Sequence, residues 1–159
     1  MAADTKSIFA QCPLPRSLEI VGERWSFLIL IGAFNRLAHF EQFQSELGIA
    51  RNILSNRLAS LVENEILYRQ PDPVDRRKVA YRLTKKGKEL LPVLIGLRQW
   101  GEKWVACAPS NPVLVDRRDR LPVAPMQVQA ADGRALALNE LEWVDAAEIG
   151  SSPRAADAA

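Results

Sequence analysis

The spacing of apolar residues changes period twice along this chain of 159 residues. Between residues 12 and 64 the apolar residues recur every three or four positions, which is the spacing of one face of an α-helix. Two short extended stretches follow, "ILYRQP" and "KVAYRLT", and they flank a turn rich in Pro and Asp, "DPVDRR". Helical spacing then resumes after Thr84, a residue suited to a helix N-cap. The sequence therefore predicts helices, then a basic hairpin, then one long helix.

The segment "RWSFLILIGAF" is apolar nearly all round, which predicts a helix at the centre of a small core. Three shorter helices are expected around it, within "CPLPRSLEIV", "HFEQFQSEL" and "ARNILSNRLASLVEN", and Asn64 is the expected left-handed C-cap of the last. Pro92 and Gly96 should weaken the long helix after the hairpin. These elements make a mainly α fold with a small β-hairpin wing (α+β), the winged helix-turn-helix, in which one helix enters a DNA major groove.

The helix predicted within residues 50 to 64 carries an unusual polar face. Its Leu and Ile residues form one apolar stripe, and Arg51, Asn52, Ser55 and Asn56 lie on the other side. Asn can pair with adenine, Arg with guanine or a phosphate, and Ser with either kind of partner. Any surface helix shows polar residues opposite an apolar stripe, so the face alone would decide nothing. The basic wing that follows makes it a candidate DNA-reading surface.

The wing turn and the edge of the same helix add further basic candidates. Arg57 has no carboxylate three or four residues away, so a backbone phosphate is its favoured partner. Arg76, Arg77 and Lys78 form a hairpin tip that could contact the DNA backbone or minor groove. Residues 48 to 88 hold 10 basic and 4 acidic side chains, although the whole chain has a net charge of only +2. A basic block of this kind can be a polyanion footprint or only a solvated face.

Composition excludes several classes of function. One histidine and two distant cysteines make an ordinary zinc site improbable and leave a nucleophile without a base, so no catalytic residue, metal or cofactor is expected. No apolar run approaches the length of a membrane span, and the first residues lack a signal-peptide profile. The cytoplasm is the expected compartment, and no membrane partner is expected.

Four stretches resemble the HxlR-type family of bacterial winged-helix transcription regulators, which are related to the MarR regulators. They are "CPLPRSLEIVGERWSFLIL", "HFEQFQSELGIARNILSNRLASLVENEILYR", "YRLTKKGKELLPVL" and "WGEKW". The resemblance covers about three fifths of the chain. It implies a homodimer that binds double-stranded DNA at an inverted-repeat operator. The implied dimer interface lies on the N-terminal helix and the helix after the wing, with candidates Leu14, Leu18, Leu94, Leu97, Trp100 and Trp104.

The chain also departs from the family pattern. The family often has Gly where this chain has Glu65, so Asn64 is expected to take over the helix stop. Ala50 stands where a Ser or Thr often caps the reading helix, which suggests that one phosphate contact is missing. The wing is more basic than is usual in the family, and stronger phosphate or minor-groove contact is expected.

Cys12 opens the first helix, where the helix dipole and Arg16 would favour a thiolate. Several relatives sense oxidants or electrophiles with a cysteine at this Cys-Pro position, so the resemblance implies a redox or small-molecule signal. An inert, packed thiol is an equal alternative. Two rival functions remain open: a winged-helix module that binds protein instead of DNA, and a thiol enzyme built around Cys12.

The expected organisation has four parts. Residues 1–11 form an N-terminal arm, and residues 12–108 form the winged helix-turn-helix domain for DNA binding and dimerisation. Residues 109–148 form a short β-rich extension, because "MQVQAADGRALALNELEWV" places an Asp-Gly turn between alternating stretches. Residues 149–159 form a disordered tail.

Overall fold

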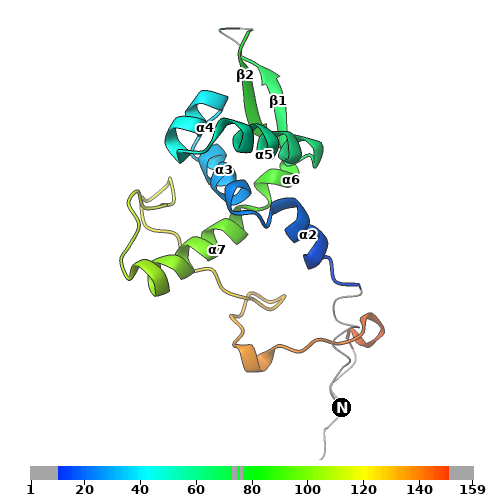
Figure 1. Ribbon diagram of the computed structural model, residues 1–159. Helices are drawn as coiled ribbons and strands as arrows, with labels where there is room; N and C mark the ends of the chain where they lie inside the picture. The colour runs from blue at the N-terminus through cyan, green and yellow to red at the C-terminus, as the bar shows by residue number, and fades with distance from the viewer. Residues whose placement is uncertain (1–10, 73–74, 76, 151–159) are drawn as a thin grey trace, which may run out of the picture. The chain divides into compact units, whose positions relative to one another are not determined.

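The computed structural model describes residues 11–72, 75 and 77–150. Its elements follow the predicted order, and the winged helix-turn-helix fold is confirmed (Figure 1). The helices before the wing are α2 (Leu14–Val21), α3 (Arg24–Phe34), α4 (Phe40–Leu47) and α5 (Arg51–Glu63). The wing consists of β1 (Leu67–Pro71) and β2 (Val79–Leu83), and it is followed by α6 (Lys85–Lys88), α7 (Leu91–Gly101) and a π-helical turn (Glu102–Ala106).

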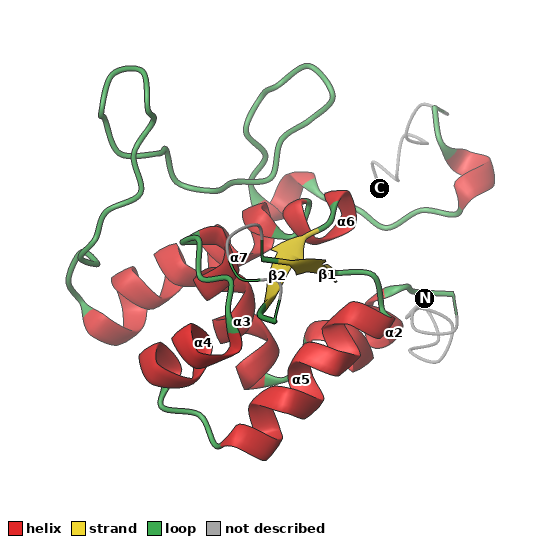
Figure 2. Ribbon diagram, turned by 90° about the horizontal axis from the view of Figure 1, so that it is seen from above, coloured by secondary structure: helices red, strands yellow, loops and turns green. Residues whose placement is uncertain are grey.

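The core forms around α3, as its all-round apolar sequence predicts. Ile29 and Leu30 of α3 have no exposed surface, and neither does Phe43 of α4. Three leucines of α5 and the start of β1 close the same cluster. Burial of one such side chain contributes about 1.5–3 kcal/mol, so this cluster is the main source of stability for the helical unit. Figure 2 shows α3 between its neighbours, with α5 running along one side.

The long helix predicted after the wing is divided into α6 and α7. Thr84 caps α6 as predicted, because the backbone N–H of Gly87 donates to its Oγ1 at 3.0 Å. A Cβ at Gly87 would lie 2.2 Å from the carbonyl oxygen of Ile66, so only glycine allows this close approach. The second helix begins at Leu91, and Pro92 occupies its first turn, where its missing N–H costs nothing.

The predicted left-handed cap at Asn64 is wrong. Asn64 ends α5 with φ −85°, and Glu65 is the residue that takes the left-handed conformation, with φ +58°. The Asn64 side chain instead donates to the carbonyl of Ser60 at 2.9 Å. Glu65 therefore occupies the turn itself, at the position where relatives often have glycine.

The two strands of the wing pair antiparallel, with Leu67 opposite Leu83 and Pro71 opposite Val79. A short bridge between His39 and Ala80 adds a third extended segment near the turn end of the wing strands. This bridge attaches the hairpin to the start of α4. The wing projects from one end of the helical unit, and α2 and α7 lie toward the other end (Figure 1).

After the π-helical turn the chain folds back on α7. The backbone N–H of Ser110 donates to Glu102 Oε1 at 3.3 Å, and Arg98 donates to the carbonyl of Pro112. Hydrogen bonds from Ser110, with a smaller contribution from the Arg98 guanidinium, lower the pKa of Glu102. We call residues 107–113 the strap.

The chain divides into two compact units, residues 1–113 and 114–159. In the described part of the second unit, the predicted hairpin is short. Gln129 and Ala135 form a bridge around the turn at Gly133, whose φ is +86°, and the backbone N–H groups of Ala130 and Leu136 donate to the carbonyls of Arg134 and Val128. A second bridge joins Val115 and Pro122, and no described residue of this unit is buried. Within the described residues, no helix is long and apolar enough to cross a membrane. Residues 1–10 of the expected arm and 151–159 of the expected tail lie outside the described residues.

Candidate nucleic-acid interface

A tight turn between α4 and α5 places the candidate reading helix. Gly48 ends α4 in the left-handed conformation, with φ +59°, which glycine adopts without steric cost. Ile49 follows and is 3% exposed, so it anchors the turn in the core. The next residues start α5 in a new direction, which is the arrangement of a helix-turn-helix.

Helix α5 is buried on one side only. Leu54, Leu58 and Leu61 are at most 1% exposed and face the core. Arg51, Asn52, Ser55 and Asn56 are all exposed, so the structure brings together the four polar residues that the sequence singled out. We call these four residues the α5 polar face.

The N-terminus of α5 is electropositive. Ala50 provides no side-chain cap, and no acidic residue lies in the first turn, so no carboxylate offsets the positive end of the helix dipole. The guanidinium of Arg51 lies 5.0 Å from the centre of the Phe40 ring of α4. This cation–π contact holds Arg51 beside the helix terminus, where backbone N–H groups favour an anion.

Arg57 differs from the α5 polar face. It is half-buried, and its Nη2 lies 3.1 Å from Glu23 Oε1 at the start of α3. The sequence offers Arg57 no carboxylate on its own helix, but the structure supplies Glu23 from another helix, which removes the reason for favouring a phosphate. Its Nε is buried without a hydrogen-bond partner. Arg57 is tied to the protein, in contrast to the exposed residues around it.

The wing tip presents Arg77 and Lys78 to solvent. The Arg77 side chain is 93% exposed, and its Nε lies 3.3 Å from Asp75 Oδ1. An ion pair this exposed contributes little free energy, so a phosphate can replace Asp75 as the partner of Arg77. Arg76, the third predicted wing residue, lies outside the described residues.

His39 connects the wing loop to α4. Its Nε2 lies 2.8 Å from Asp72 Oδ2, and both side chains are mostly buried. Asp72 Oδ1 in turn accepts from the backbone N–H of Asp75, and the Asp72 N–H donates to the carbonyl of Lys78. This contact fixes the base of the wing tip relative to the helix-turn-helix. Nothing in the local sequence indicates this pair, because the two residues are 33 positions apart.

Two further basic residues near the site have different roles. Arg69 is exposed on β1, and sequence reasoning missed it because it lies inside a strand candidate. Lys86 donates to the carbonyl of Asn64 at 2.8 Å and so stabilises the end of α5. Lys86 therefore acts as a cap on the backbone of α5, whereas Arg69 belongs to the basic surface of the wing.

The predicted dimer residues fall into two groups. Leu94 is 3% exposed and belongs to the core of its own chain, so its assignment to a dimer interface is wrong. Around the helix axis Leu94 lies about a quarter turn from the exposed residues Leu97, Trp100 and Trp104. It is also spaced three residues from Leu97, as the members of one helix face are, so spacing alone grouped it with them. The other predicted interface residues are exposed in the single chain: Leu14, Leu18, Leu97, Trp100 and Trp104.

Cys12 is half-buried just before α2, and Cys107 is exposed after the π-helical turn. Arg16, which was expected to favour a Cys12 thiolate, is paired with Glu19 at 2.6 Å. The cation is therefore shared with a carboxylate, which weakens that argument. Among the described residues, no group of three or more His, Cys, Asp and Glu side chains could hold a metal ion.

The chain resembles proteins with the same architecture. The HxlR-like helix-turn-helix family model matches residues 20–108. Mb3122 of Mycobacterium bovis, an uncharacterized HTH-type transcriptional regulator, is 41% identical over 98 residues, which are 62% of this chain and 62% of its own length. The chain thus spans under two thirds of the length of that relative.

Two solved structures extend the likeness. PA1607, a candidate transcription factor, is 40% identical with a TM-score of 0.78 and is matched over 88% of this chain and 99% of its own. The oxidized form of the redox regulator HypR is 25% identical with a TM-score of 0.53, over 58% of this chain and 96% of its own. With its helix-turn-helix, its wing and the match over residues 20–108, the chain belongs to the HxlR-like helix-turn-helix family.

Proposed function

We propose that this chain is a cytoplasmic, sequence-specific DNA-binding transcription regulator that acts as a homodimer on an inverted-repeat operator. The observation that carries the proposal is the α5 polar face, which is exposed on the helix that leads into the basic wing. Membership of a family of helix-turn-helix regulators supports this proposal. The proposal includes no enzymatic activity.

In this proposal α5 lies in the major groove. The amides of Asn52 and Asn56 read base edges, Ser55 contacts a base or a phosphate, and Arg51 binds a phosphate at the helix N-terminus. Arg77 and Lys78 contact the backbone or the minor groove through the wing. These contacts separate into two kinds: those of α5 give sequence preference, and those of the wing give affinity that depends on salt.

Homodimerisation is supported by the apolar residues that remain exposed on α2 and α7. Two protomers related by a two-fold axis would place their α5 helices about 34 Å apart, the distance between successive major grooves on one side of a duplex. A signal would act by changing that distance or angle, because only a ligand that distinguishes two states shifts their equilibrium.

The proposed signal is an oxidant or electrophile that modifies Cys12. The likeness to a protein named as a redox regulator supports this, as does the place of the thiol at the start of α2, beside the exposed Leu14. Modification there would alter the packing of α2 in the dimer. Oxidant should therefore change the DNA affinity of the native chain and leave Cys12→Ser unchanged, with Cys107→Ser as the matched control.

Footprinting on the promoter nearest to its own gene tests the main proposal. We expect two protected half-sites separated by one helical turn, and we expect the pattern to change with oxidant in a Cys12-dependent way. A purified chain that prefers no promoter fragment over random competitor DNA at moderate ionic strength would contradict the proposal.

A further inference from the structure

The second unit carries large apolar side chains that nothing within the unit covers. Trp143 is 95% exposed and Leu138 is 87% exposed, and Leu141, Val144 and Ile149 are exposed near them. A tryptophan can bury about 150–250 Å² of surface, so leaving it in water forfeits a large gain in free energy. We call residues 138–149 the Trp143 segment.

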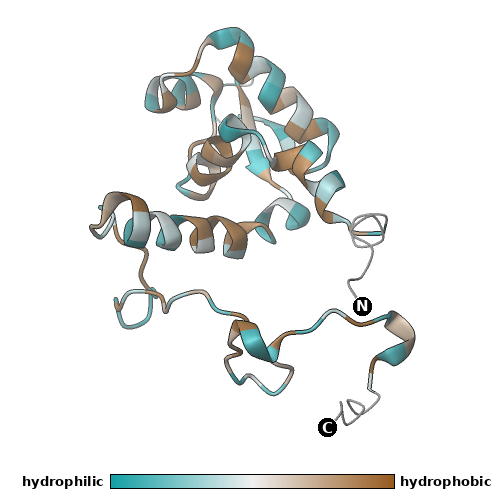
Figure 3. Cartoon of the chain, turned by 60° about the horizontal axis from the view of Figure 1, so that its bottom comes forward, coloured by the Kyte–Doolittle hydropathy of each residue, from teal (hydrophilic) through white to brown (hydrophobic). Residues whose placement is uncertain are grey.

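Helix α7 has an apolar stripe that its own unit also leaves uncovered. Val93, Leu97 and Trp100 of α7 and Trp104 of the π-helical turn that continues it follow one another at intervals of four, three and four residues, so they lie on one side. Each is more than half exposed. Apolar positions continue along α7 to its C-terminal end (Figure 3).

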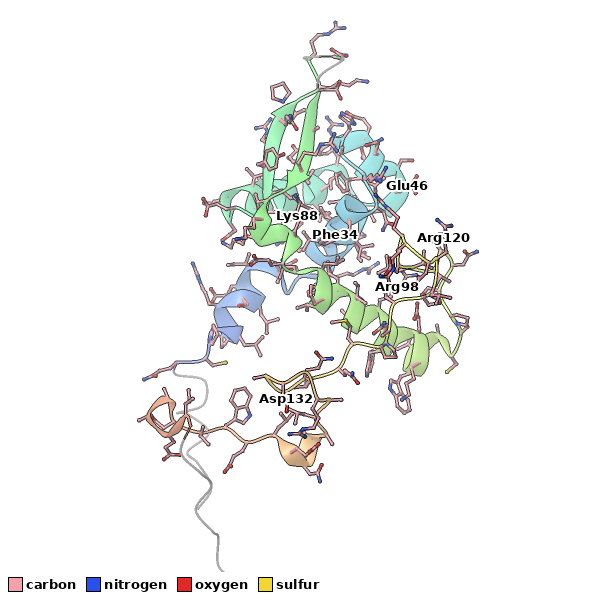
Figure 4. The ribbon with its side chains drawn as sticks, turned by 180° about the vertical axis from the view of Figure 1, so that it is seen from behind. Phe34, Glu46, Lys88, Arg98, Arg120 and Asp132 are labelled. Carbon is pink, nitrogen blue, oxygen red and sulfur yellow. The ribbon has the colours of Figure 1, made fainter. Side chains whose placement is uncertain are left out.

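The strap is held on the other side of α7. Its contacts are made to Arg98 and Glu102, and Arg98 is labelled beside it in Figure 4. At about 100° per residue, these two side chains lie roughly 130–170° around the helix from the centre of the apolar stripe. The strap therefore runs along the side of α7 that faces away from the stripe and does not cover the stripe.

The charges of the two surfaces are complementary. Residues 138–150 contain Glu140, Glu142, Asp145 and Glu148 and no basic residue, and Glu140 is paired with Arg134 of its own unit at 2.8 Å. At the end of the α7 stripe, the Lys103 Nζ lies 4.8 Å from the centre of the Trp104 ring. Over whole units, residues 1–113 carry 16 basic and 11 acidic side chains, and residues 114–159 carry 5 and 8. A second copy of the chain offers both the apolar and the electrostatic complement.

We propose that, in the homodimer on which the proposed function rests, the Trp143 segment of each protomer docks on the Trp100 and Trp104 end of the partner's α7 stripe. Trp143 supplies the apolar contact, and the acidic residues of the segment face Lys103. The N-terminal part of the stripe, with Leu14 and Leu18 of α2, remains for contact between the two helical units.

The size of these surfaces fits this arrangement. A stable specific interface buries about 800 Å² on each partner. Three tryptophans at about 150–250 Å² each, with their aliphatic neighbours, reach that range.

Complementation between two full-length variants tests the exchange. Trp143→Glu damages the segment, and Trp104→Glu damages the stripe. One tryptophan at the centre of an interface accounts for about 30-fold in affinity, and the homodimer holds two such sites, so each variant alone should dimerise up to about 900-fold more weakly than the native chain. In a mixture of the two, the intact segment of one chain can dock on the intact stripe of the other, so heterodimers should form at lower concentration than either parent homodimer. Sedimentation analysis of labelled chains measures all three constants.

The controls separate this proposal from the proposed function. Ala131→Glu adds the same charge to the same unit without removing an apolar side chain, and it should leave dimerisation unchanged. Circular dichroism melting checks that unit 1 stays folded in every variant, and binding to a single half-site reports on α5. If the mixture dimerises no better than its parents, or if Trp143→Glu dimerises normally, the docking proposal is wrong even where half-site binding is intact.

Discussion

Removing the wing-tip charges should flatten the salt dependence of DNA binding. The perturbation is the double substitution Arg77→Gln with Lys78→Gln. Both residues are exposed, and the ion pair of Arg77 with Asp75 is too exposed to hold its guanidinium away from a phosphate. Neither residue belongs to the core, so the fold should be unaffected.

The expected magnitude follows from counterion release. Each phosphate that a cation neutralises adds about 0.9 to the slope of log affinity against log salt concentration. Two residues in each of two protomers therefore account for about 3.6 units of slope in a dimer. Between about 50 and 200 mM salt, the native chain should lose roughly 150-fold more affinity than the variant.

Fluorescence anisotropy with a labelled operator, measured across that range of salt, gives both slopes. Arg117→Gln with Arg118→Gln is the matched control, because it removes an exposed basic pair from the second unit and changes the net charge equally. If the wing variant keeps the native slope, the wing does not contact phosphate. If the control flattens the slope as much, net charge and not position explains the effect.

Three further predictions concern the scaffold of the site. Glu65→Gly should raise the free energy of unfolding by about 0.5–1 kcal/mol in urea titrations. A non-glycine residue in the left-handed conformation costs about 1–2 kcal/mol, and glycine removes this cost but loses more conformational entropy on folding. A loss of stability would show that the turn is unstrained. A double-mutant cycle of His39→Ala and Asp72→Asn should give a coupling free energy of about 0.5–3 kcal/mol, and additive effects would mean that the two side chains act independently. Ser110→Ala removes the Ser110 hydroxyl and keeps its backbone N–H, so it should raise the pKa of Glu102 in a carboxyl NMR titration, because the side-chain hydrogen bond of Ser110 is the largest cause of the lowered pKa. The stability that this contact adds is present above the unfolded-state pKa and is lost as pH falls through the lowered value, and an unchanged titration would contradict the side-chain hydrogen bond.

The helix-turn-helix could be predicted because it depends on local spacing. The leucines of α5 recur at intervals of four and three residues, and this spacing alone places Asn52 and Ser55 on the exposed side. The all-round apolar sequence of α3 likewise predicts a buried helix. Turn residues at Gly48 and Thr84 act through their own backbone and neighbours, so their roles could also be predicted.

Contacts between distant segments could not be predicted in this way. Arg57 seemed free because its partner, Glu23, lies on another helix, and Leu94 seemed exposed because spacing does not reveal which side of α7 meets the core. The predicted hairpin of the second unit forms only as a short paired segment around its turn, for a related reason. An Asp-Gly turn forms locally, but extended strands need a partner surface to pack against, and no residue in the described part of that unit is buried.

The central claim is that the α5 polar face reads base edges. The most direct test is the ratio of operator affinity to random-DNA affinity for Asn52→Ala with Asn56→Ala, compared with Asn139→Ala in the second unit. The ratio for the Asn52 and Asn56 variant should fall by about tenfold or more, because one bidentate amide contact discriminates between the right and the wrong base by about 1–3 kcal/mol. Its affinity for random DNA should stay the same. An unchanged ratio would contradict the claim.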